Sequence, residues 1–120
     1  MIIKYHANGL YVKKDGDLYQ IGLSDKGQDD VGDVMFCNLA KQEGHLSKGD
    51  TIMGVEGAKA VTDFTAPFDG QIVAANQAIE DQPDLLNSSS QEENWILKLE
   101  EVKEEDFNQL NDQAWPEEDD

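Results

Sequence analysis

The stretch that decides the fold reads Gly54-Val55-Glu56-Gly57-Ala58-Lys59-Ala60-Val61-Thr62-Asp63. Lys59 lies in the middle of it, between small residues and between two short runs that are rich in β-branched side chains. A glycine-containing approach with β-rich runs on both sides is typical of a tight hairpin. We therefore expect Lys59 at the hairpin tip, with its amine in solvent and accessible to a modifying enzyme. Judged by composition alone, it would be an ordinary exposed turn lysine.

Short β-rich runs of the same kind recur on both sides of this hairpin. Turn signals such as Asn8-Gly9, Asp15-Gly16 and Asp69-Gly70 separate them at fairly even intervals. The expected strands cover residues 10–13, 18–23, 34–39, 51–55, 61–65, 71–75 and 95–99. Many short strands with this punctuation predict a mostly β chain folded as an antiparallel sandwich or flattened barrel.

Short helical segments are expected around this sandwich. Ser24 is a good N-cap, and the segment from Ser24 to Val31 has few β-branched residues, which predicts a short helix that ends near Gly32. The segment from Glu104 to Leu110 predicts a final amphipathic helix. One helical turn is expected at residues 83–86 and a surface loop at residues 87–94.

Length and charge limit what the chain can do. Its 120 residues suffice for one domain, expected over residues 1–112, with an acidic C-terminal tail at residues 113–120. The formal net charge is −17, with nine lysines and no arginine, and residues 100–120 carry −9 of it. Phosphate backbones and anionic membranes would repel such a chain, so we expect neither a nucleic-acid nor a membrane partner. The acidic surface could instead guide docking onto basic entrances of partner enzymes.

The sequence also predicts a cytoplasmic protein. The longest apolar runs, such as residues 72–75, are too short to cross a bilayer, and the first residues do not resemble a secretory signal. Cys37 is the one cysteine, so an internal disulfide is excluded and a reducing compartment fits.

Candidate sites other than Lys59 are weak. Cys37 shares an apolar run with Met35 and is expected to be a buried, inert thiol. His6 and His45 have no partner at metal-ligand spacing, so no zinc site is predicted. Trp95 is expected in the core. Because no Ser/His/Asp group or phosphate-binding glycine loop is present, we expect a protein that is not itself an enzyme.

The stretch Gly54-Val55-Glu56-x-x-Lys59-Ala60-Val61-x-Asp63 closely resembles the lipoylation hairpin of glycine cleavage H-proteins. In that family a glutamate three residues before the lysine and an Ala-Val pair after it are typical. Four further segments resemble the family in the same order along the chain. They are residues 21–34, 66–70, 76–87 and 94–99. With the neighbouring strands and final helix, the resemblance extends from about residue 18 to residue 110.

This resemblance implies a biotinyl/lipoyl-carrier hybrid sandwich, with lipoate joined to Lys59 as an amide. The hairpin residues that would be recognised with it are Glu56, Gly57, Ala58, Ala60, Val61 and Asp63. Biotin is the competing cofactor of this fold, but biotinyl hairpins usually place methionine on each side of the lysine. Here Ala58 and Ala60 occupy those positions, so lipoate is favoured.

The resemblance also implies partners. A lipoate ligase or transferase would load Lys59. The lipoyl arm would then carry aminomethyl groups and reducing equivalents between glycine decarboxylase, aminomethyltransferase and dihydrolipoyl dehydrogenase. The chain itself would be a non-catalytic carrier, expected to be a monomer.

Three departures from the family pattern keep alternatives open. Gly57 stands where a serine is common, the usual His-Glu-Trp signature near the N-terminus is missing, and the C-terminal stretch resembles a variant, H-like branch. Members of that branch accompany macrodomain and sirtuin-type ADP-ribosyltransferase proteins. The alternative function is therefore a lipoyl carrier in lipoate relay or redox response, regulated by ADP-ribosylation. A further alternative is an unmodified interaction module in which Lys59 is only a turn residue.

Overall fold

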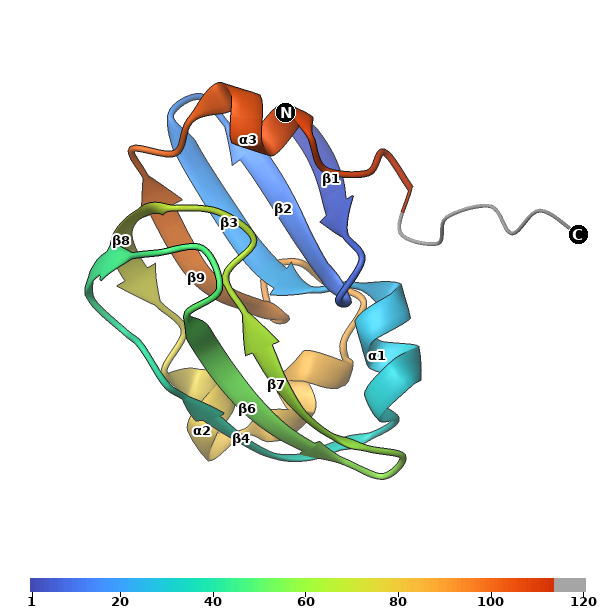
Figure 1. The fold of residues 1–120 in the computed structure, drawn as a ribbon. Helices are drawn as coiled ribbons and strands as arrows, with labels where there is room; N and C mark the ends of the chain where they lie inside the picture. Colours follow the sequence, from blue (N-terminus) through green and yellow to red (C-terminus); the bar gives the residue numbers. More distant parts are fainter. Residues whose placement is uncertain (114–120) are drawn as a thin grey trace, which may run out of the picture.

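The computed structural model describes residues 1–113 as two antiparallel sheets with short helices around them (Figure 1). The strands are β1 (Ile2–His6), β2 (Leu10–Asp15), β3 (Leu18–Leu23), β4 (Val34–Leu39), β5 (Gly44–Leu46), β6 (Thr51–Gly57), β7 (Val61–Thr65), β8 (Gly70–Ala75) and β9 (Trp95–Glu100). The helices are α1 (Asp25–Val31), α2 (Ala78–Asp81), the 3-10 helix η1 (Pro83–Asn87) and α3 (Glu104–Asn108).

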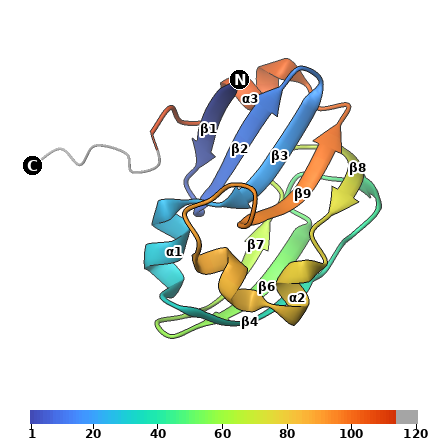
Figure 2. The same ribbon diagram turned by 180° about the vertical axis from the view of Figure 1, so that it is seen from behind.

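The larger sheet has six strands in the order β1-β2-β3-β9-β8-β5. Its first three strands follow one another along the chain through short turns, whereas β9 comes from the far end of the chain and pairs with both β3 and β8. Figure 2, seen from behind, shows β9 in the middle of this sheet. The sheet is therefore complete only when the last strand is in place.

The smaller sheet has three strands in the order β4-β6-β7 and carries the candidate hairpin. β6 is the central strand and pairs antiparallel with both neighbours. The register of β4 shifts between Val34 and Phe36, so one residue is left out of the pairing there. This irregularity leaves both Met35 and Phe36 exposed, where strict alternation would have buried one of them.

The two sheets bury their facing side chains in one hydrophobic cluster, as sandwiches of this kind do. Fully buried members from the larger sheet include Leu10, Ile21 and Leu97, and those from the smaller sheet include Ile52, Val55 and Phe64. The core therefore fixes the inner face of the smaller sheet, while its outer face remains at the surface.

Helices close the ends of the sandwich. The Ser24 hydroxyl accepts a hydrogen bond from the Gly27 N–H at 3.2 Å and begins α1, as an N-cap should. α3 packs Phe107 into the core, where its ring meets that of Tyr19 edge to face with centroids 5.4 Å apart. Short helices here cover the sheets without adding a second core.

The predicted fold class is confirmed: a mostly β sandwich with short peripheral helices and a C-terminal helix. The Ser24-capped helix and the turn at residues 83–86 also form where the sequence predicts them. Three elements were not predicted, namely β1, β5 and α2. Each is short, and β1 and β5 lie at the edges of the larger sheet, where burial imposes the weakest pattern.

The placements of two residues were wrong. Trp95 is only half buried, on the outer face of the sheet, with the Lys98 ammonium 4.7 Å from its ring centroid. The surface loop predicted at residues 87–94 forms, but its last residue, Asn94, is buried and its side-chain oxygen accepts a hydrogen bond from the Tyr11 hydroxyl at 2.8 Å. Both residues adjoin the start of β9, where the exposed loop turns into the core.

The predicted acidic tail at residues 113–120 lies outside the described residues except for Gln113. The expected domain boundary after residue 112 and the placement of Trp115 therefore stay predictions. Within residues 1–113, no helix is long and apolar enough to span a membrane.

Candidate functional site: a lysine at a fixed hairpin tip

Lys59 lies at the tip of the β6–β7 hairpin. Glu56 pairs with Val61 across the two strands, and the Gly57 N–H donates to the Ala60 carbonyl at 2.9 Å. That bond closes the turn and leaves three residues, Ala58-Lys59-Ala60, beyond the ladder. The hairpin predicted from the sequence is therefore present, with Lys59 at its apex.

The tip is not free in solution but rests on the end of α1, beside which it lies in both views of the ribbon (Figures 1 and 2). The Lys59 backbone N–H donates to the Val31 carbonyl, and the Ala58 N–H donates to the Asp33 carbonyl, each at 2.9 Å. Carbonyls at the end of a helix lack partners within the helix, and here the hairpin supplies one. The backbone of Lys59 is thereby held at a defined place.

Glycine makes this close contact possible on both sides. Gly32 ends α1 with φ +73°, a conformation that other residues rarely adopt, and a Cβ there would lie 2.9 Å from Lys59 Cγ. A Cβ on Gly57 would overlap the Val31 carbonyl oxygen and lie 2.8 Å from its carbon. We call this contact surface, formed by Val31, Gly32 and Gly57, the hairpin seat.

The seat is itself supported from behind. The Gln28 side-chain amide donates to the carbonyls of Leu86 and Ser88, which ties α1 to η1. The Asn87 side chain accepts from the Val34 N–H at 2.8 Å and ties η1 to the start of β4. A shift of α1 relative to η1 would therefore break both hydrogen bonds of Gln28.

The Lys59 side chain, by contrast, extends into solvent and is 62% exposed. Its Nζ donates to the Asp29 backbone carbonyl at 3.3 Å and lies 3.8 Å from the Asp29 carboxylate. An ion pair between two side chains that are both more than half exposed contributes little stability. The amine is therefore reachable by an enzyme and only weakly held.

The other predicted hairpin residues fall into two groups. Glu56, Val61 and Asp63 are exposed on the outer face of the smaller sheet. Ala58 is exposed at the tip, whereas Gly57 and Ala60 are half buried next to it. The structure thus brings all six residues into one region around Lys59.

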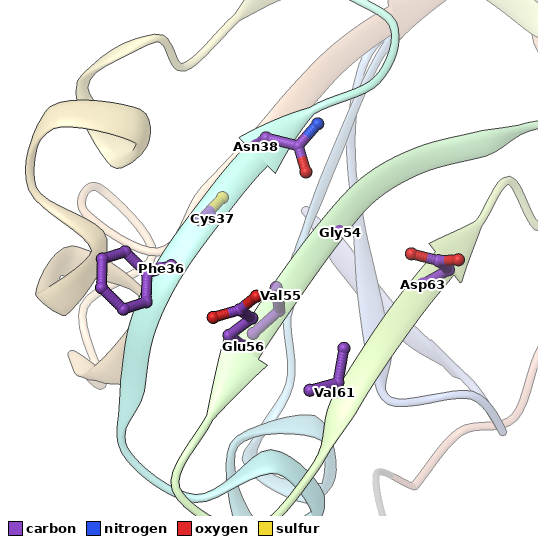
Figure 3. A pocket seen from close by; sticks show the side chains of 8 residues that line it. All are labelled: Phe36, Cys37, Asn38, Gly54, Val55, Glu56, Val61 and Asp63. Atoms are coloured by element: carbon purple, nitrogen blue, oxygen red, sulfur yellow. The ribbon is translucent and has the colours of Figure 1, made fainter.

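A groove of about 210 Å³ lies on the outer face beside this hairpin (Figure 3). Its floor is Gly54, which has no side chain, and its two sides are formed by β4 and β7. Phe36 and Asn38 stand on one side, and Val61 and Asp63 on the other. The groove therefore adjoins three of the predicted hairpin residues.

Sequence reasoning missed Phe36, Asn38 and the hairpin seat. Phe36 lies within a predicted strand, but its exposure depends on the register shift in β4, for which the sequence gives no signal. Gly57 was predicted as a hairpin residue and Gly32 as the end of a helix, but nothing in the sequence brings the two glycines to one contact surface. Their contact joins residues far apart in the chain, so it becomes visible only in the fold.

Cys37 lines the same groove, in surroundings that disfavour its thiolate form. It is half buried rather than fully buried as expected, and Met35 does not share its surroundings because Met35 is exposed. Burial, and to a smaller extent the nearby Glu80 charge, raises the pKa of the Cys37 thiol to about 12. The prediction of an unreactive thiol agrees with this direction, since the thiolate is the reactive form.

The fold and this site define a small antiparallel sandwich that presents one lysine on a fixed hairpin. A family model described as "Glycine cleavage H-protein" matches residues 3–118. The chain therefore belongs to the glycine cleavage H-protein family. The match is to the family as a whole and does not separate its branches, so the assignment to the H-like branch stays a prediction.

Relatives of known name agree with this membership. The glycine cleavage system H protein of Listeria monocytogenes serotype 4a (strain HCC23) is 45% identical over 106 residues, covering 88% of this chain and 85% of the relative. That of Listeria innocua serovar 6a is 43% identical with the same coverage. The crystal structure of a glycine cleavage system H protein from Mycobacterium marinum matches with a TM-score of 0.71 and 26% identity, over 82% of each chain.

Proposed function

We propose that this protein is a lipoyl carrier of glycine cleavage, with lipoate attached through an amide to Lys59. The observation that carries the proposal is the hairpin tip: a lysine with a 62% exposed side chain on a backbone held by hydrogen bonds to Val31 and Asp33. The proposal is also supported by membership of the H-protein family, since relatives named glycine cleavage system H protein are similar to this chain in sequence over most of its length.

The residues fit the proposed group. A primary amine is the nucleophile that amide formation needs, and only alanines flank it, so no bulky neighbour obstructs the approach. Acylation removes the positive charge of Lys59, which also ends its ion pair with Asp29. Lipoate, when attached, supplies a dithiolane that can take up a group or two electrons.

The chain's own contribution is to position and tether. A fixed hairpin seat confines movement to the side chain and whatever it carries, so the reactive end searches a defined volume around the tip. Tethering raises the effective concentration of the carried group at a partner active site. Such a role requires no catalytic group on the carrier.

The partner set follows from the same proposal. A lipoate ligase or transferase would recognise the hairpin through Glu56, Gly57, Ala58, Ala60, Val61 and Asp63. Glycine decarboxylase, aminomethyltransferase and dihydrolipoyl dehydrogenase would then use the loaded carrier, in the cytoplasm. The alternative with macrodomain and sirtuin-type partners and ADP-ribosylation rests on the C-terminal resemblance alone.

Intact and peptide mass spectrometry of the protein from its own cells, grown with lipoate, tests the proposal. We expect a lipoyl increment on the peptide that contains Lys59, and its loss in Lys59→Arg. Lys48→Arg is the matched control, because Lys48 is also an exposed lysine in a tight turn and should leave the increment unchanged. An unmodified Lys59 in cells whose ligase is active would contradict the carrier function.

A further inference from the structure

The groove over Gly54 has a chemical character of its own. Phe36 and Val61 contribute apolar surface and are 63% and 78% exposed, high values for large apolar side chains. Glu56 and Asp63 contribute carboxylates to the same lining, and no lysine is among the lining residues. The groove is therefore apolar on opposite sides and negatively charged.

The arrangement follows from strand register. Phe36, Glu56 and Val61 are directly paired across β4, β6 and β7, so their side chains form one row on the outer face. Asn38, Gly54 and Asp63 are paired in the same way and form a second row on this face, two residues further along each strand. Because the middle member of that second row is glycine, no side chain rises between Asn38 and Asp63, and only the movable ends of these two side chains lean toward the gap.

A basic side chain fits this groove. At about 210 Å³ it is smaller than the 300–1,000 Å³ typical of sites for small-molecule ligands. The long methylene stem of an arginine or lysine packs well on apolar walls while its charged end remains polar. Its cation would meet the Glu56 and Asp63 carboxylates, and the Phe36 ring face favours a cation.

We propose that this groove receives one arginine or lysine side chain of the enzyme that acylates Lys59. The inference rests on the proposed function and adds Phe36 and Gly54 of the smaller sheet to the recognition surface. The acylating enzyme is the partner that the position favours, because it must bring its active site to the Lys59 nitrogen itself. Enzymes that act on the far end of the arm can bind the carrier at a greater distance.

The test fills the groove without touching the hairpin tip. Gly54→Val places a side chain where the cation would lie, and a β-branched residue suits a strand. A Cβ at Gly54 would meet Asn38 Oδ1 at 2.8 Å and Asp63 Oδ1 at 3.3 Å, both at the ends of side chains that can move aside. Gly54→Ala is the milder second variant, should the valine disturb folding.

Steady-state lipoylation by the organism's own ligase, with lipoate and ATP, is measured by intact mass over a range of carrier concentrations. We expect Gly54→Val to raise KM for the carrier roughly tenfold with kcat retained, because binding is lost while Lys59 stays on its seat. Asp63→Asn should raise KM about threefold or more, and added salt should reduce its difference from wild type.

Two controls separate the outcomes. Asp17→Asn removes one exposed charge at the distant β2–β3 turn, and Val73→Ser removes one exposed apolar side chain from β8 of the other sheet. Both should leave KM within twofold of wild type. If folded Gly54→Val and Asp63→Asn also stay within twofold, or if Asp17→Asn matches Asp63→Asn, the groove does not bind the enzyme. Failure of wild type itself to gain the increment would instead reject the proposed function.

Discussion

The β2–β3 and β6–β7 hairpin turns differ in what lies beneath them. The β2–β3 turn contains Gly16 at φ +61°, and a Cβ on Gly16 would meet nothing within 4 Å. The β6–β7 turn is packed so closely on α1 that a Cβ on Gly57 would overlap the Val31 carbonyl. Gly16 is required for backbone conformation alone, whereas Gly57 is required for the space it leaves.

This difference shows which of the two turns is fixed by contacts with the rest of the protein. The first turn only has to reverse the chain, so solvent can surround it. The second holds Lys59 at one place relative to the body of the protein, through hydrogen bonds from Lys59 to Val31, the last residue of α1, and from Ala58 to Asp33 just beyond it. Gly57 thus acts through packing against a neighbour, which a turn-propensity argument does not capture.

The largest expected effect comes from Gly57→Val. The added side chain must push the hairpin off the Val31 carbonyl, so we expect the free energy of unfolding to fall by about 3 kcal/mol, as for severe overpacking. Urea denaturation measures it. Gly16→Asn is the control, because asparagine tolerates positive φ and its side chain enters open space; a loss below about 1 kcal/mol is expected there. Equal losses at the two turns would remove the distinction between them.

The β2–β3 hairpin is held along its strands by hydrogen bonds of the Tyr11 hydroxyl, and these can be tested by measuring stability at high pH. The Tyr11 hydroxyl donates to the Asn94 side chain and accepts from the Gln20 amide. Burial raises the pKa of Tyr11 to about 12, although the Gln20 hydrogen bond lowers it slightly.

The unfolded chain releases the Tyr11 proton near pH 10, but the folded chain retains it until about pH 12. Its contribution to stability is therefore fully present below pH 10 and is lost between pH 10 and pH 12, by roughly 2–3 kcal/mol. Tyr11→Phe should show a flatter dependence of unfolding free energy on pH over this range. Parallel curves for the two proteins would show that Tyr11 ionises normally.

Gly32→Ala tests the other side of the hairpin seat. Alanine must adopt φ +73° and its Cβ would press on Lys59, so we expect a loss of about 2 kcal/mol together with slower lipoylation. Gly44→Ala likewise places a side chain at positive φ, +87°, but its Cβ would have no neighbour within 4 Å. It should lose about 1 kcal/mol and keep the wild-type lipoylation rate. A normal rate in Gly32→Ala would show that the seat does not position Lys59.

The smallest effect is expected for Asp29→Asn, which removes the ion pair of Lys59. Both side chains are mostly exposed, so the free energy of unfolding should change by less than about 0.5 kcal/mol. Thermal unfolding at low and high salt measures this. A loss above 1 kcal/mol would mean that the side chain of Lys59, and not only its backbone, is fixed by the seat.

The features predicted from sequence are those with local causes. The hairpin around Lys59 and the helix capped by Ser24 depend on residues within a few positions of each other, and both formed as expected. The hydrogen bond between the Lys59 N–H and the Val31 carbonyl joins residues that are distant in the chain, so no local sequence pattern predicts it. The exposure of Phe36 follows from a pairing irregularity that depends on the neighbouring strand.

The incorrect prediction for Trp95 also has a non-local cause. Trp95 has the size and apolarity of a core residue, yet it lies on the outer face at the point where β9 begins and stacks with Lys98. Its alternation with Leu97 suggested burial, but the register of β3 and β9 shifts beside it, between Ile21 and Gly22. The alternation of apolar residues predicts which face of a sheet a side chain occupies only where the strand pairing is regular.

The late pairing of β9 has a consequence for synthesis of the protein. Lys59 and α1 leave the ribosome well before residues 95–100, yet β3, which leads directly into α1, has an unpaired edge until β9 arrives. In a nascent chain, an acylating enzyme would therefore meet the Lys59 hairpin while the larger sheet beneath α1 is still incomplete. We expect lipoylation to follow release of the chain, so that only molecules that have closed their larger sheet become loaded carriers.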